Sequence, residues 1–296
     1  MSAQTNPLVG DGGRARRRKL AGQVMEALAT AAAVLAAVVL AIVLFTLTKR
    51  ALPAINVDLF TQNAAPFGQT GGGIKNAIVG TVIITGIATA IALPAGVLLA
   101  IFNTEFAPRR LADLIGLTLN VLSGVPTIVI GVFIFGLVVV GRGQSAYAGA
   151  LGLSIVMLPL VARATEEVLR LVPSHLREGG MALGATRART VITVILPTAI
   201  GGIVTATIVA VARAAGETAP LLFTTSIFVG TTVNTDPSQA MASIPMVIFT
   251  SSEQPDPHAQ QQAWAAALVL VVIVLAGSIA GRLLSLRTRR QIEQVR

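Results

Sequence analysis

The feature that most constrains this chain is a series of long apolar blocks that fit the thickness of a lipid bilayer. The hydrocarbon core of a bilayer is roughly 30 Å thick, so a spanning helix needs about 20 apolar residues. Six blocks approach or exceed that length: Leu20 to Leu47, Lys75 to Phe102, Leu114 to Val140, Tyr147 to Val161, Val191 to Ala215, and Ala263 to Leu286. Because the blocks are continuous and do not alternate, they indicate helices and not the strands of a barrel. We therefore expect an all-α integral membrane protein whose six transmembrane helices occupy residues 20–286.

The positive charges predict how the spans are oriented. Most of the 22 Lys and Arg residues lie before the first block, between the second and third, between the fourth and fifth, and after the sixth. Residues 214–281 contain none. Because Lys and Arg gather in cytoplasmic loops, both termini are expected in the cytoplasm, with residues 1–19 as a mobile basic segment and 287–296 as a tail. The net charge of +9 is thus a topology signal, since a nucleic-acid binder would gather its cations on one face of a folded domain.

Two stretches of the membrane region are expected to be irregular. The largest extracytoplasmic connection, residues 218–262, contains two apolar pieces, Leu221 to Gly230 and Met241 to Thr250, each about half as long as a span. Irregular backbone survives at membrane depth only where protein or water satisfies its polar groups, so we expect both pieces to be re-entrant or interfacial and buried against helices. Polar residues from Asn120 to Thr127 interrupt the third block, either to line a pathway or to bond a neighbouring helix.

The one long cytoplasmic connection, residues 164–190, predicts two short helices. An apolar stripe at helical spacing runs from Val168 to Val172, and Pro173 should end that helix. Ser174 is a plausible N-cap for a second helix that ends near Gly184, a residue suited to a left-handed C-cap. Short, partly apolar helices on the cytoplasmic side need a partner that covers them.

This connection resembles the coupling loop of ABC importer permeases. The family pattern is Glu-Ala-Ala, three residues, Gly, nine residues, then Ile-x-Leu-Pro, and the spacing, the cytoplasmic side and the position before a span all agree. The matching residues are Glu178, Gly179, Gly180, Gly184, Leu196 and Pro197. The resemblance implies the type I ABC importer permease fold, whose cytoplasmic coupling helix seats in a cleft of a separate ATPase subunit and transmits its closure. Two glycines stand where the pattern has alanines, which should cost the helix about 1 kcal/mol each.

The residue inventory argues against chemistry on the chain itself. There is no cysteine, and no Gly-rich phosphate loop of the form G-x-x-x-x-G-K-[ST], so ATP must be hydrolysed on a separate subunit. No two acidic residues inside the spans are placed to share a metal, because the adjacent Glu166 and Glu167 should point to different helix faces. We therefore expect a non-catalytic chain that binds no metal or cofactor, with ATP and Mg held by the partner ATPase.

Arg213 and Glu217, at the end of the fifth block, are the most costly residues to place in a membrane. In a helix they would lie one turn apart on one face, where an unpaired Arg costs several kcal/mol unless a partner or a water-filled cavity receives it. Glu217 is the expected resting partner. We hypothesise that an anion displaces Glu217 from Arg213, because guanidinium donors suit a phosphate oxygen pair and a carboxylate can accept from a protonated phosphate oxygen. The alternative is a structural ion pair that only fixes the helix.

Three segments resemble the PstA-type permeases of high-affinity phosphate importers: Ala212 to Phe223, Arg163 to Val168, and Ser123 to Thr127. The resemblance extends over most of the chain and implies a multi-pass, channel-forming subunit of the bacterial cell membrane that moves inorganic phosphate. It also implies a related sister permease (PstC-like) as heterodimer partner, two copies of an ATPase (PstB-like) and an extracytoplasmic phosphate-binding protein (PstS-like). In that family, the residues associated with transport match Arg213, Glu217 and Arg163. From the residues alone, Arg163 either adds positive potential to the route or anchors its helix at the cytoplasmic face.

Three other functions compete with this one. A permease for another oxyanion, such as sulfate or molybdate, would share the same architecture, although the Arg-Ala-Ala-Gly-Glu-Thr segment weighs against it. A membrane enzyme acting on lipid substrates would need clustered carboxylates around a metal. An ion-coupled carrier would need ionisable relays in several spans, and it would leave the coupling loop unexplained.

Overall fold

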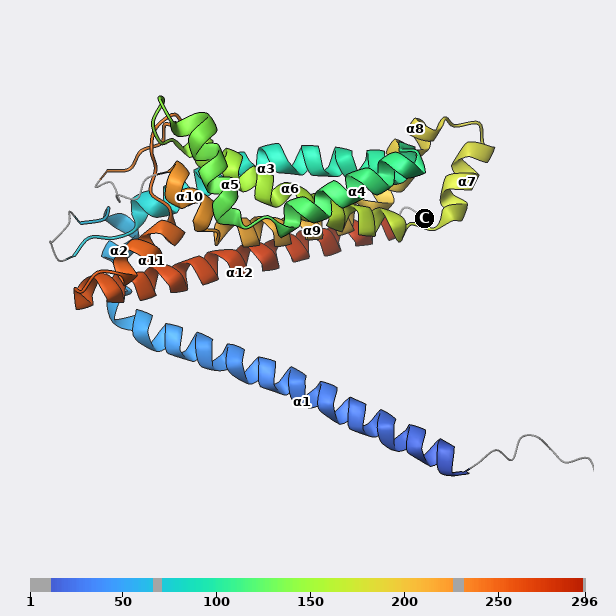
Figure 1. The fold of residues 1–296 in the computed structure, drawn as a ribbon, viewed down its shortest axis with the longest axis horizontal. Coiled ribbons are helices and arrows are strands. Elements are labelled where there is room, and N and C mark those ends of the chain that lie inside the picture. The colour runs from blue at the N-terminus through green and yellow to red at the C-terminus, as the bar shows by residue number, and fades with distance from the viewer. Residues whose placement is uncertain (1–11, 66–70, 226–231, 295–296) are drawn as a thin grey trace, which may run out of the picture. The chain divides into compact units, whose positions relative to one another are not determined.

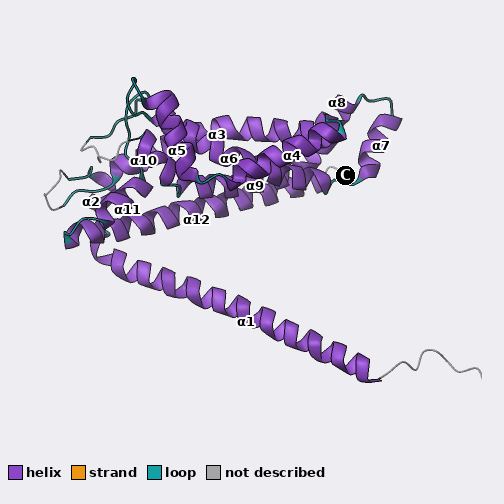
Figure 2. Ribbon diagram, viewed as in Figure 1, coloured by secondary structure: helices purple, strands orange, loops and turns teal. Residues whose placement is uncertain are grey.

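The computed structural model describes residues 12–65, 71–225 and 232–294, and these ranges are helical with no strand beyond an isolated bridge between Ala64 and Gly72 (Figures 1 and 2). The 3₁₀ helix is η1 (Leu52–Ala54), and the π-helices are η2 (Phe102–Phe106), η3 (Phe135–Val139) and η4 (Val191–Ile195). The α-helices are α1 (Gly12–Ala51), α2 (Val57–Thr61), α3 (Lys75–Ile101), α4 (Arg109–Gly124), α5 (Thr127–Ile134), α6 (Ala146–Arg170), α7 (Ser174–Ala182), α8 (Arg187–Thr190), α9 (Leu196–Ala215), α10 (Ala219–Thr224), α11 (Ile244–Ser252) and α12 (Pro257–Gln294). The predicted all-α fold class is confirmed.

The chain divides into two units, of which the first is residues 1–50 and consists of α1 where it is described. This 40-residue helix carries the first predicted span. Residues 12–19, which were predicted to be mobile, form its first turns, because Ala, Arg and Lys are good helix formers. Residues 1–11 of that segment lie outside the described ranges.

The second unit contains the other predicted spans. The helices α3 and α12 match the second and sixth blocks, and Arg187–Ala215, formed by α8, η4 and α9, contains the fifth. The fourth span is longer than predicted, because α6 continues through its charged residues as far as Arg170. Arg163, Glu166 and Arg170 pair with one another, as described below, so these charges do not end the helix. Within the described residues, five helices are long and apolar enough to cross a membrane, or six if the bent pair formed by α4 and α5 is one span.

The third predicted span is not a single straight helix. Arg109–Gly124 and Thr127–Val139 meet at an angle of 93°. Val125 and Pro126 between them are in extended conformations, with ψ angles of 128° and 129°. Proline lacks an N–H donor and disfavours the helical conformation of the residue before it, so this pair breaks the span that the apolar pattern alone had suggested.

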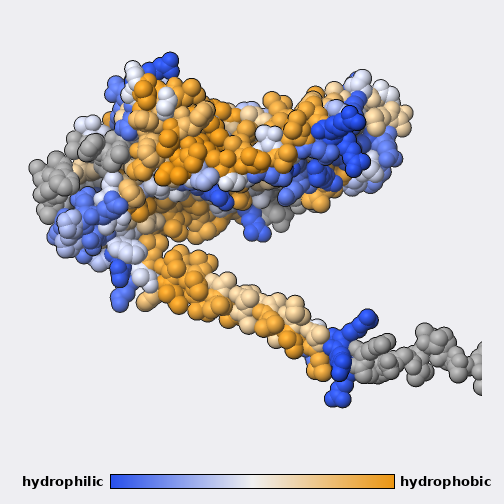
Figure 3. Space-filling view, viewed as in Figure 1, coloured by the Kyte–Doolittle hydropathy of each residue, from blue (hydrophilic) through white to orange (hydrophobic). Residues whose placement is uncertain are grey.

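The core of the second unit lies where α3, α6 and α9 pack together, with α10 and α11 against them. Small residues let α3 approach α6 closely: Ala88 and Ala92 are buried, and a Cβ atom on Gly96 would lie 2.9 Å from Val161. In lipid, where apolar burial gives little driving force, such close backbone approach supplies much of the packing energy. Figure 3 shows apolar side chains over the middle of this unit, with hydrophilic residues gathered near α7 and α8 and near α2 and α11. That distribution is the one expected of a membrane-embedded bundle.

The two half-length apolar pieces are buried against this bundle, as predicted. Leu221 in α10 is 2% exposed and Ile244 in α11 is fully buried. The N–H of Ile244 donates to the hydroxyl of Thr81 in α3 at 2.8 Å, and the backbone before α11 comes so close to α3 that a Cβ on Gly80 would lie 1.9 Å from the carbonyl oxygen of Ala242. Residues 226–231 of the first piece lie outside the described ranges.

Candidate functional site

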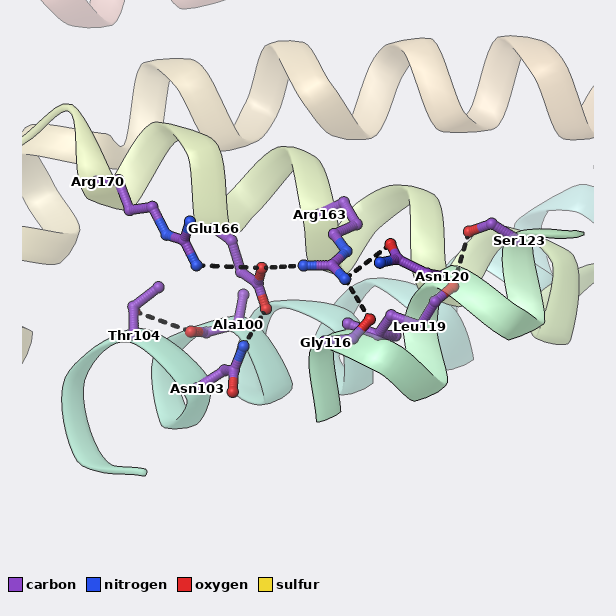
Figure 4. A network of polar contacts seen from close by, with 10 residues as sticks. All are labelled: Ala100, Asn103, Thr104, Gly116, Leu119, Asn120, Ser123, Arg163, Glu166 and Arg170. Atoms are coloured by element: carbon purple, nitrogen blue, oxygen red, sulfur yellow. Dashed lines mark hydrogen bonds and ion pairs between the residues drawn. The ribbon is translucent and has the colours of Figure 1, made fainter. Parts of the chain in front are cut away.

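The guanidinium of Arg163 lies between α6 and α4 and has partners on both helices (Figure 4). Its Nη1 donates to Glu166 Oε2 at 2.9 Å, one turn further along α6. Its Nη2 donates to Asn120 Oδ1 at 2.8 Å and to the backbone carbonyl of Gly116, both on α4. The Arg163 side chain remains 30% exposed. Arg163 therefore ties α6 to the first half of the bent pair, close to the break in the third span, and part of its surface stays open.

Glu166 is the acidic centre of this network and is 2% exposed. Its Oε1 accepts from Asn103 Nδ2 in η2 at 2.6 Å, and its Oε2 lies 4.0 Å from Nη2 of Arg170. Glu167 is exposed, so the two adjacent carboxylates do point to different faces. The sequence pattern did not single out Glu166 as a partner of Arg163, although their three-residue spacing within a helix was a usable signal.

The network carries more positive than negative charge, because two guanidiniums, those of Arg163 and Arg170, face one carboxylate. Within the described residues, the buried Nε of Arg163 and Oδ1 of Asn103 have no hydrogen-bond partner. A buried donor without a partner costs about 1–3 kcal/mol. Nε itself is buried, so it is the excess positive charge and the exposed part of the Arg163 side chain that favour an anion nearby. Among the residues that the structure describes, no three His, Cys, Asp or Glu side chains gather as a metal site would require.

Arg213 and Glu217 do not form the expected ion pair in this structure. Arg213 lies in the last turn of α9 and is exposed, whereas Glu217 is half-buried and follows the C-cap residue Gly216. The N–H of Glu217 donates to the carbonyl of Ala214, which closes a turn beyond the helix. Because α9 has ended, the four-residue spacing no longer places the two side chains on one face. Among the described residues, neither side chain has a hydrogen bond or ion pair, so the Arg213 guanidinium is available to a ligand.

The two irregular segments of the second unit lie near each other. The break after α4 leads into α5 and the break after α9 leads into α10, and these two short helices pack together. A Cβ on Gly131 in α5 would lie 2.8 Å from Cα of Pro220 in α10. On its other side, Pro220 faces Gly152 of α6, where a Cβ would lie 3.4 Å from the proline ring. The segments that carried the sequence resemblance, from Ser123, Arg163 and Ala212 onward, thus come together around α6.

The predicted coupling loop contains α7, but its first predicted helix does not exist as a separate element. The stripe from Val168 to Val172 is the end of α6, which continues past the membrane block. The next helix starts at Ser174, with Pro173 at the N-cap, one residue earlier than predicted. It ends as predicted near Gly184, whose φ of +83° and two backbone bonds, Gly184 N–H to Met181 and Ala185 N–H to Gly180, form a Schellman cap.

The two glycines of α7 that replace alanines of the family pattern have different surroundings. A Cβ on Gly179 would meet nothing within 4 Å, whereas one on Gly180 would lie 2.6 Å from Cγ2 of Thr190. Gly180 therefore permits the close approach of α7 to α8, and an alanine there would not fit. No residue of α7, which the structure describes in full, is buried, and Glu178 on this helix is exposed.

The C-terminal part of the motif lies where the fifth span begins. Leu196 is half-buried and packs on a cluster of buried residues that includes Leu169 and Ile195. Pro197 is exposed at the start of α9, directly after the π-helix η4. The motif therefore joins a solvent-facing helix, α7, to a span that is anchored in the bundle.

A buried ion pair that the sequence pattern did not reveal connects α7 to the bundle. Arg177 in α7 donates to Glu105 in η2 through Nε and Nη2, with a shortest distance of 2.8 Å, and Glu105 is 3% exposed. The same guanidinium donates to the carbonyls of Val172 at 2.6 Å and Leu169 at 2.7 Å. An acidic residue at the end of a long apolar block was the available signal, since such a residue needs a partner.

Broken spans, a capped solvent-facing helix before the fifth span and an anion-friendly network inside the bundle define a type I ABC importer permease, a multi-pass membrane protein. The family model described as "Binding-protein-dependent transport system inner membrane component" matches residues 92–290. The chain belongs to this family.

Relatives with established names agree with the predicted resemblance. The chain is 38% identical over 229 residues to the phosphate transport system permease protein PstA 1 of Mycobacterium tuberculosis (strain H37Rv), covering 75% of this chain and 73% of that protein. It is 37% identical over 277 residues to the phosphate transport system permease protein PstA of Xylella fastidiosa (strain 9a5c), covering 93% of this chain and 96% of that protein. The resemblance to PstA-type permeases is confirmed.

Solved structures support the same fold. A bacterial alginate ABC transporter in complex with a pentasaccharide-bound periplasmic protein aligns with a TM-score of 0.64 at 14% identity, covering 92% of this chain and 96% of that chain. The inward-facing MetNI methionine ABC transporter aligns with a TM-score of 0.57 at 22% identity, covering 72% and 93%. At these identities the likeness concerns the fold alone.

Proposed function

We propose that this chain is the channel-forming subunit of an ATP-driven importer that moves inorganic phosphate across the cell membrane. The observation that carries the proposal is the combination of relatives named as phosphate permeases with two arginines, Arg163 and Arg213, at the broken spans of the bundle. One has a buried donor without a partner, and the guanidinium of the other is unpaired among the described residues. Arg213 is therefore able to bind an anion, and Arg163 adds positive charge to the route.

The three transport residues have distinct roles in this proposal. The planar donors of Arg213 hold two phosphate oxygens, and Arg163 supplies positive potential further along the route. Glu217 accepts a hydrogen bond from a protonated phosphate oxygen, which distinguishes this anion from a fully ionised one such as sulfate. Because Arg213 and Glu217 are separate in this structure, the anion does not have to displace the carboxylate before it binds, which simplifies the mechanism expected from the sequence.

The chain works with partners that supply energy and capture. A related sister permease (PstC-like) completes the channel as a heterodimer, two ATPase copies (PstB-like) bind ATP and Mg, and an extracytoplasmic phosphate-binding protein (PstS-like) delivers the anion. In this proposal the exposed helix α7, with Glu178 on its surface, seats in the ATPase subunit. The distribution of Lys and Arg supports cytoplasmic positions for both termini. The chain itself binds no cofactor and catalyses no reaction.

Uptake of radiolabelled phosphate tests this function. Arg213→Ala should slow uptake by about tenfold or more, since a hydrogen-bonded charge contact contributes about 1.5–3 kcal/mol. Arg142→Ala is the matched control, because Arg142 is an exposed arginine in the turn after η3, at the opposite end of Thr127–Val139 from the break at Pro126. If Arg213→Ala cells take up phosphate as fast as the parent, Arg213 does not contact the anion.

A competition experiment separates phosphate from other oxyanions. Unlabelled phosphate should suppress uptake of labelled phosphate, while sulfate and molybdate at the same concentration should not. Uptake of labelled sulfate or molybdate, with no uptake of labelled phosphate, would reassign the chain to the other oxyanion class.

A further inference from the structure

The π-helix η2 lies between the solvent-facing helix α7 and the Arg163 network, and its side chains reach three other helices. Asn103 donates to Glu166 on α6, and Glu105 accepts from Arg177 on α7. Phe106 lies under the guanidinium of Arg187, 5.9 Å from the ring centroid. The backbone of η2 makes the wide turn of a π-helix, because the N–H of Ala107 donates to the carbonyl of Phe102 five residues earlier. π-helical turns are rare and occur frequently at functional sites.

Helix α7 is attached to the bundle at three places. Leu176 packs on the buried cluster around Leu169, Gly180 lies against the buried Thr190, and Arg177 makes a forked ion pair with Glu105. Of these contacts, the one made by Arg177 leads directly to η2. Bidentate Arg–carboxylate pairs have a defined geometry, unlike single flexible contacts. Arg177 therefore gives a displacement of α7 by a partner protein a direct path to η2.

The path from Glu105 to α4 runs first along the backbone of η2 and then through polar side-chain contacts. Asn103 lies two residues earlier in the same π-turn and bonds to Glu166, which pairs with Arg163, which bonds to Asn120. Figure 4 shows Glu166, Arg163 and Asn120 following one another, with Asn103 reaching Glu166 from the η2 turn. Energetic coupling between distant sites travels through such packed, hydrogen-bonded elements when one of them has two alternative arrangements.

Glu166 provides the two alternatives. Its Oε2 lies 2.9 Å from Arg163 and 4.0 Å from Arg170, on opposite sides along α6. Asn103 holds the other oxygen and so sets which way the carboxylate leans.

We propose that η2 relays movement of α7 to the anion route by switching Glu166 from Arg163 to Arg170, which releases Nη1 of Arg163 for the anion while Nη2 keeps its bonds to α4. This inference rests on the proposed function and adds how anion binding to Arg163 is regulated. Asn103, Glu105, Arg177 and Arg170 are then positioning residues that touch no anion themselves. In this proposal, the arrangement seen here, with Arg163 paired to Glu166, is the one in which Arg163 does not hold the anion.

The test uses the complete transporter, reconstituted in liposomes with its ATPase and binding protein, and measures phosphate transported per ATP hydrolysed. Arg177→Gln and Asn103→Ala should each lower this ratio about tenfold while ATP hydrolysis changes little. Because both act on one path, the double variant should be no worse than the more impaired single variant. Equal losses of transport and hydrolysis in Arg177→Gln would mean that Arg177 only supports docking, and would overturn the relay.

Arg170 gives the sharpest test, because its side chain is 69% exposed and its contact with Glu166 is long. A fixed ion pair between Arg163 and Glu166 predicts no effect of Arg170→Ala, whereas the exchange predicts about a fivefold lower ratio and recovery in Arg170→Lys. Arg142→Ala again serves as the exposed control. A ratio for Arg170→Ala equal to that of the parent would overturn the proposal, and this variant removes no buried contact that folding requires.

A second readout does not depend on which anion is carried. Because the chain has no cysteine, Ser123→Cys introduces a single thiol at the bend between α4 and α5. Its rate of modification by a water-soluble thiol reagent should differ between the nucleotide-free and the ATP-vanadate-trapped transporter, and this difference should vanish with Arg177→Gln. If the parent carries no phosphate but shows this difference, only the proposed function fails. If the parent carries phosphate and Arg177→Gln keeps the difference, only the relay fails.

Discussion

The two ends of the membrane bundle are held together in different ways. At the α11 end, formed by α10, α11 and residues 232–243, helices and loops meet by close backbone approach, as at Gly80 against Ala242 and Gly131 against Pro220. At the α7 end, formed by η2, α7, α8 and the last turns of α6, buried charges make the contacts, as at Glu105 and Glu166. Tightly packed backbone segments have a single arrangement, whereas a carboxylate between two guanidiniums can pair with either of them. The difference indicates a rigid end and a switchable end.

Backbone carbonyls also fix the α11 end. The N-terminus of α6 is capped by carbonyls from distant segments: Ser145 N–H donates to Thr224, Ala146 N–H to Gln239 and Tyr147 N–H to Pro237. These bonds satisfy helix donors that would otherwise lack partners. The α11 end thus closes over α6 without using any ionised side chain for the purpose.

The largest effect on this comparison is expected from filling the space at Gly80. Gly80→Ala would place a methyl group 1.9 Å from the carbonyl oxygen of Ala242, so the backbone before α11 must move. We expect a loss at the upper end of the roughly 1–3 kcal/mol that overpacking costs, measured as a lower unfolding temperature in detergent. Gly86→Ala in the same helix is the matched control, because nothing lies within 4 Å of its Cβ position. Equal stability of the two variants would show that the α11 end is not tightly packed.

A smaller effect is expected from removing one charge at the α7 end. Glu166→Gln keeps the shape of the side chain but weakens the bond to Arg163, at a cost of about 2 kcal/mol. Glu167→Gln, one residue further and exposed, should leave the unfolding temperature unchanged. Because the loss is electrostatic, the two variants should differ most at low salt. A large effect of Glu167→Gln would mean that its carboxylate has a buried role that the static arrangement hides.

The sequence predicted the parts of this fold that depend on apolar length and on turn chemistry. Long apolar blocks placed α3 and α12, and Gly184 was identified as the C-cap of α7 because a left-handed residue there suits glycine. Bilayer thickness and backbone sterics act locally along the chain, so the pattern alone reveals their outcome. The coupling motif, from Glu178 to Pro197, was identified differently, through its resemblance to the pattern of a known family.

Pairings between distant residues were not predictable in this way. The 93° break at Pro126 was hidden because the apolar run continues on both sides of it. The expected pair of Arg213 and Glu217 failed because Gly216 ends the helix between them, and Glu105 gained its partner Arg177 from a segment far along the chain. Such contacts depend on how helices pack, which residue spacing within one helix does not determine.

Alanine substitutions at the two glycines of α7 should change the free energy of unfolding by about 1 kcal/mol, in opposite directions. Gly179→Ala should stabilise the isolated permease by up to about 1 kcal/mol, because alanine is the better helix former and the position is open. Gly180→Ala should destabilise it by about 1 kcal/mol, because its methyl group meets Thr190. Adding Thr190→Ala should restore stability, since the Thr190 hydroxyl has no partner among the described residues. If Gly180→Ala is as stable as Gly179→Ala, α7 and α8 are not in close contact.

The smallest effect is expected from Asp236, a fully exposed charge at the α11 end. The backbone N–H of Ser238 and then its hydroxyl, both donating to Asp236 Oδ1, hold the pKa of this carboxyl below its ordinary value of 3.8. A group with a lowered folded-state pKa adds stability above its unfolded pKa and loses it as the pH falls through the folded value, so any contribution disappears only in acid, below about 3.8. Ser238→Ala removes the second of the two donors and should raise the pKa of Asp236 part of the way to 3.8, as NMR titration of the labelled carboxyl can measure. At neutral pH its unfolding temperature should equal that of the parent. If Ser238→Ala lowered the unfolding temperature as much as Glu166→Gln does, the α11 end would be held by charge, like the α7 end, and not by close backbone packing.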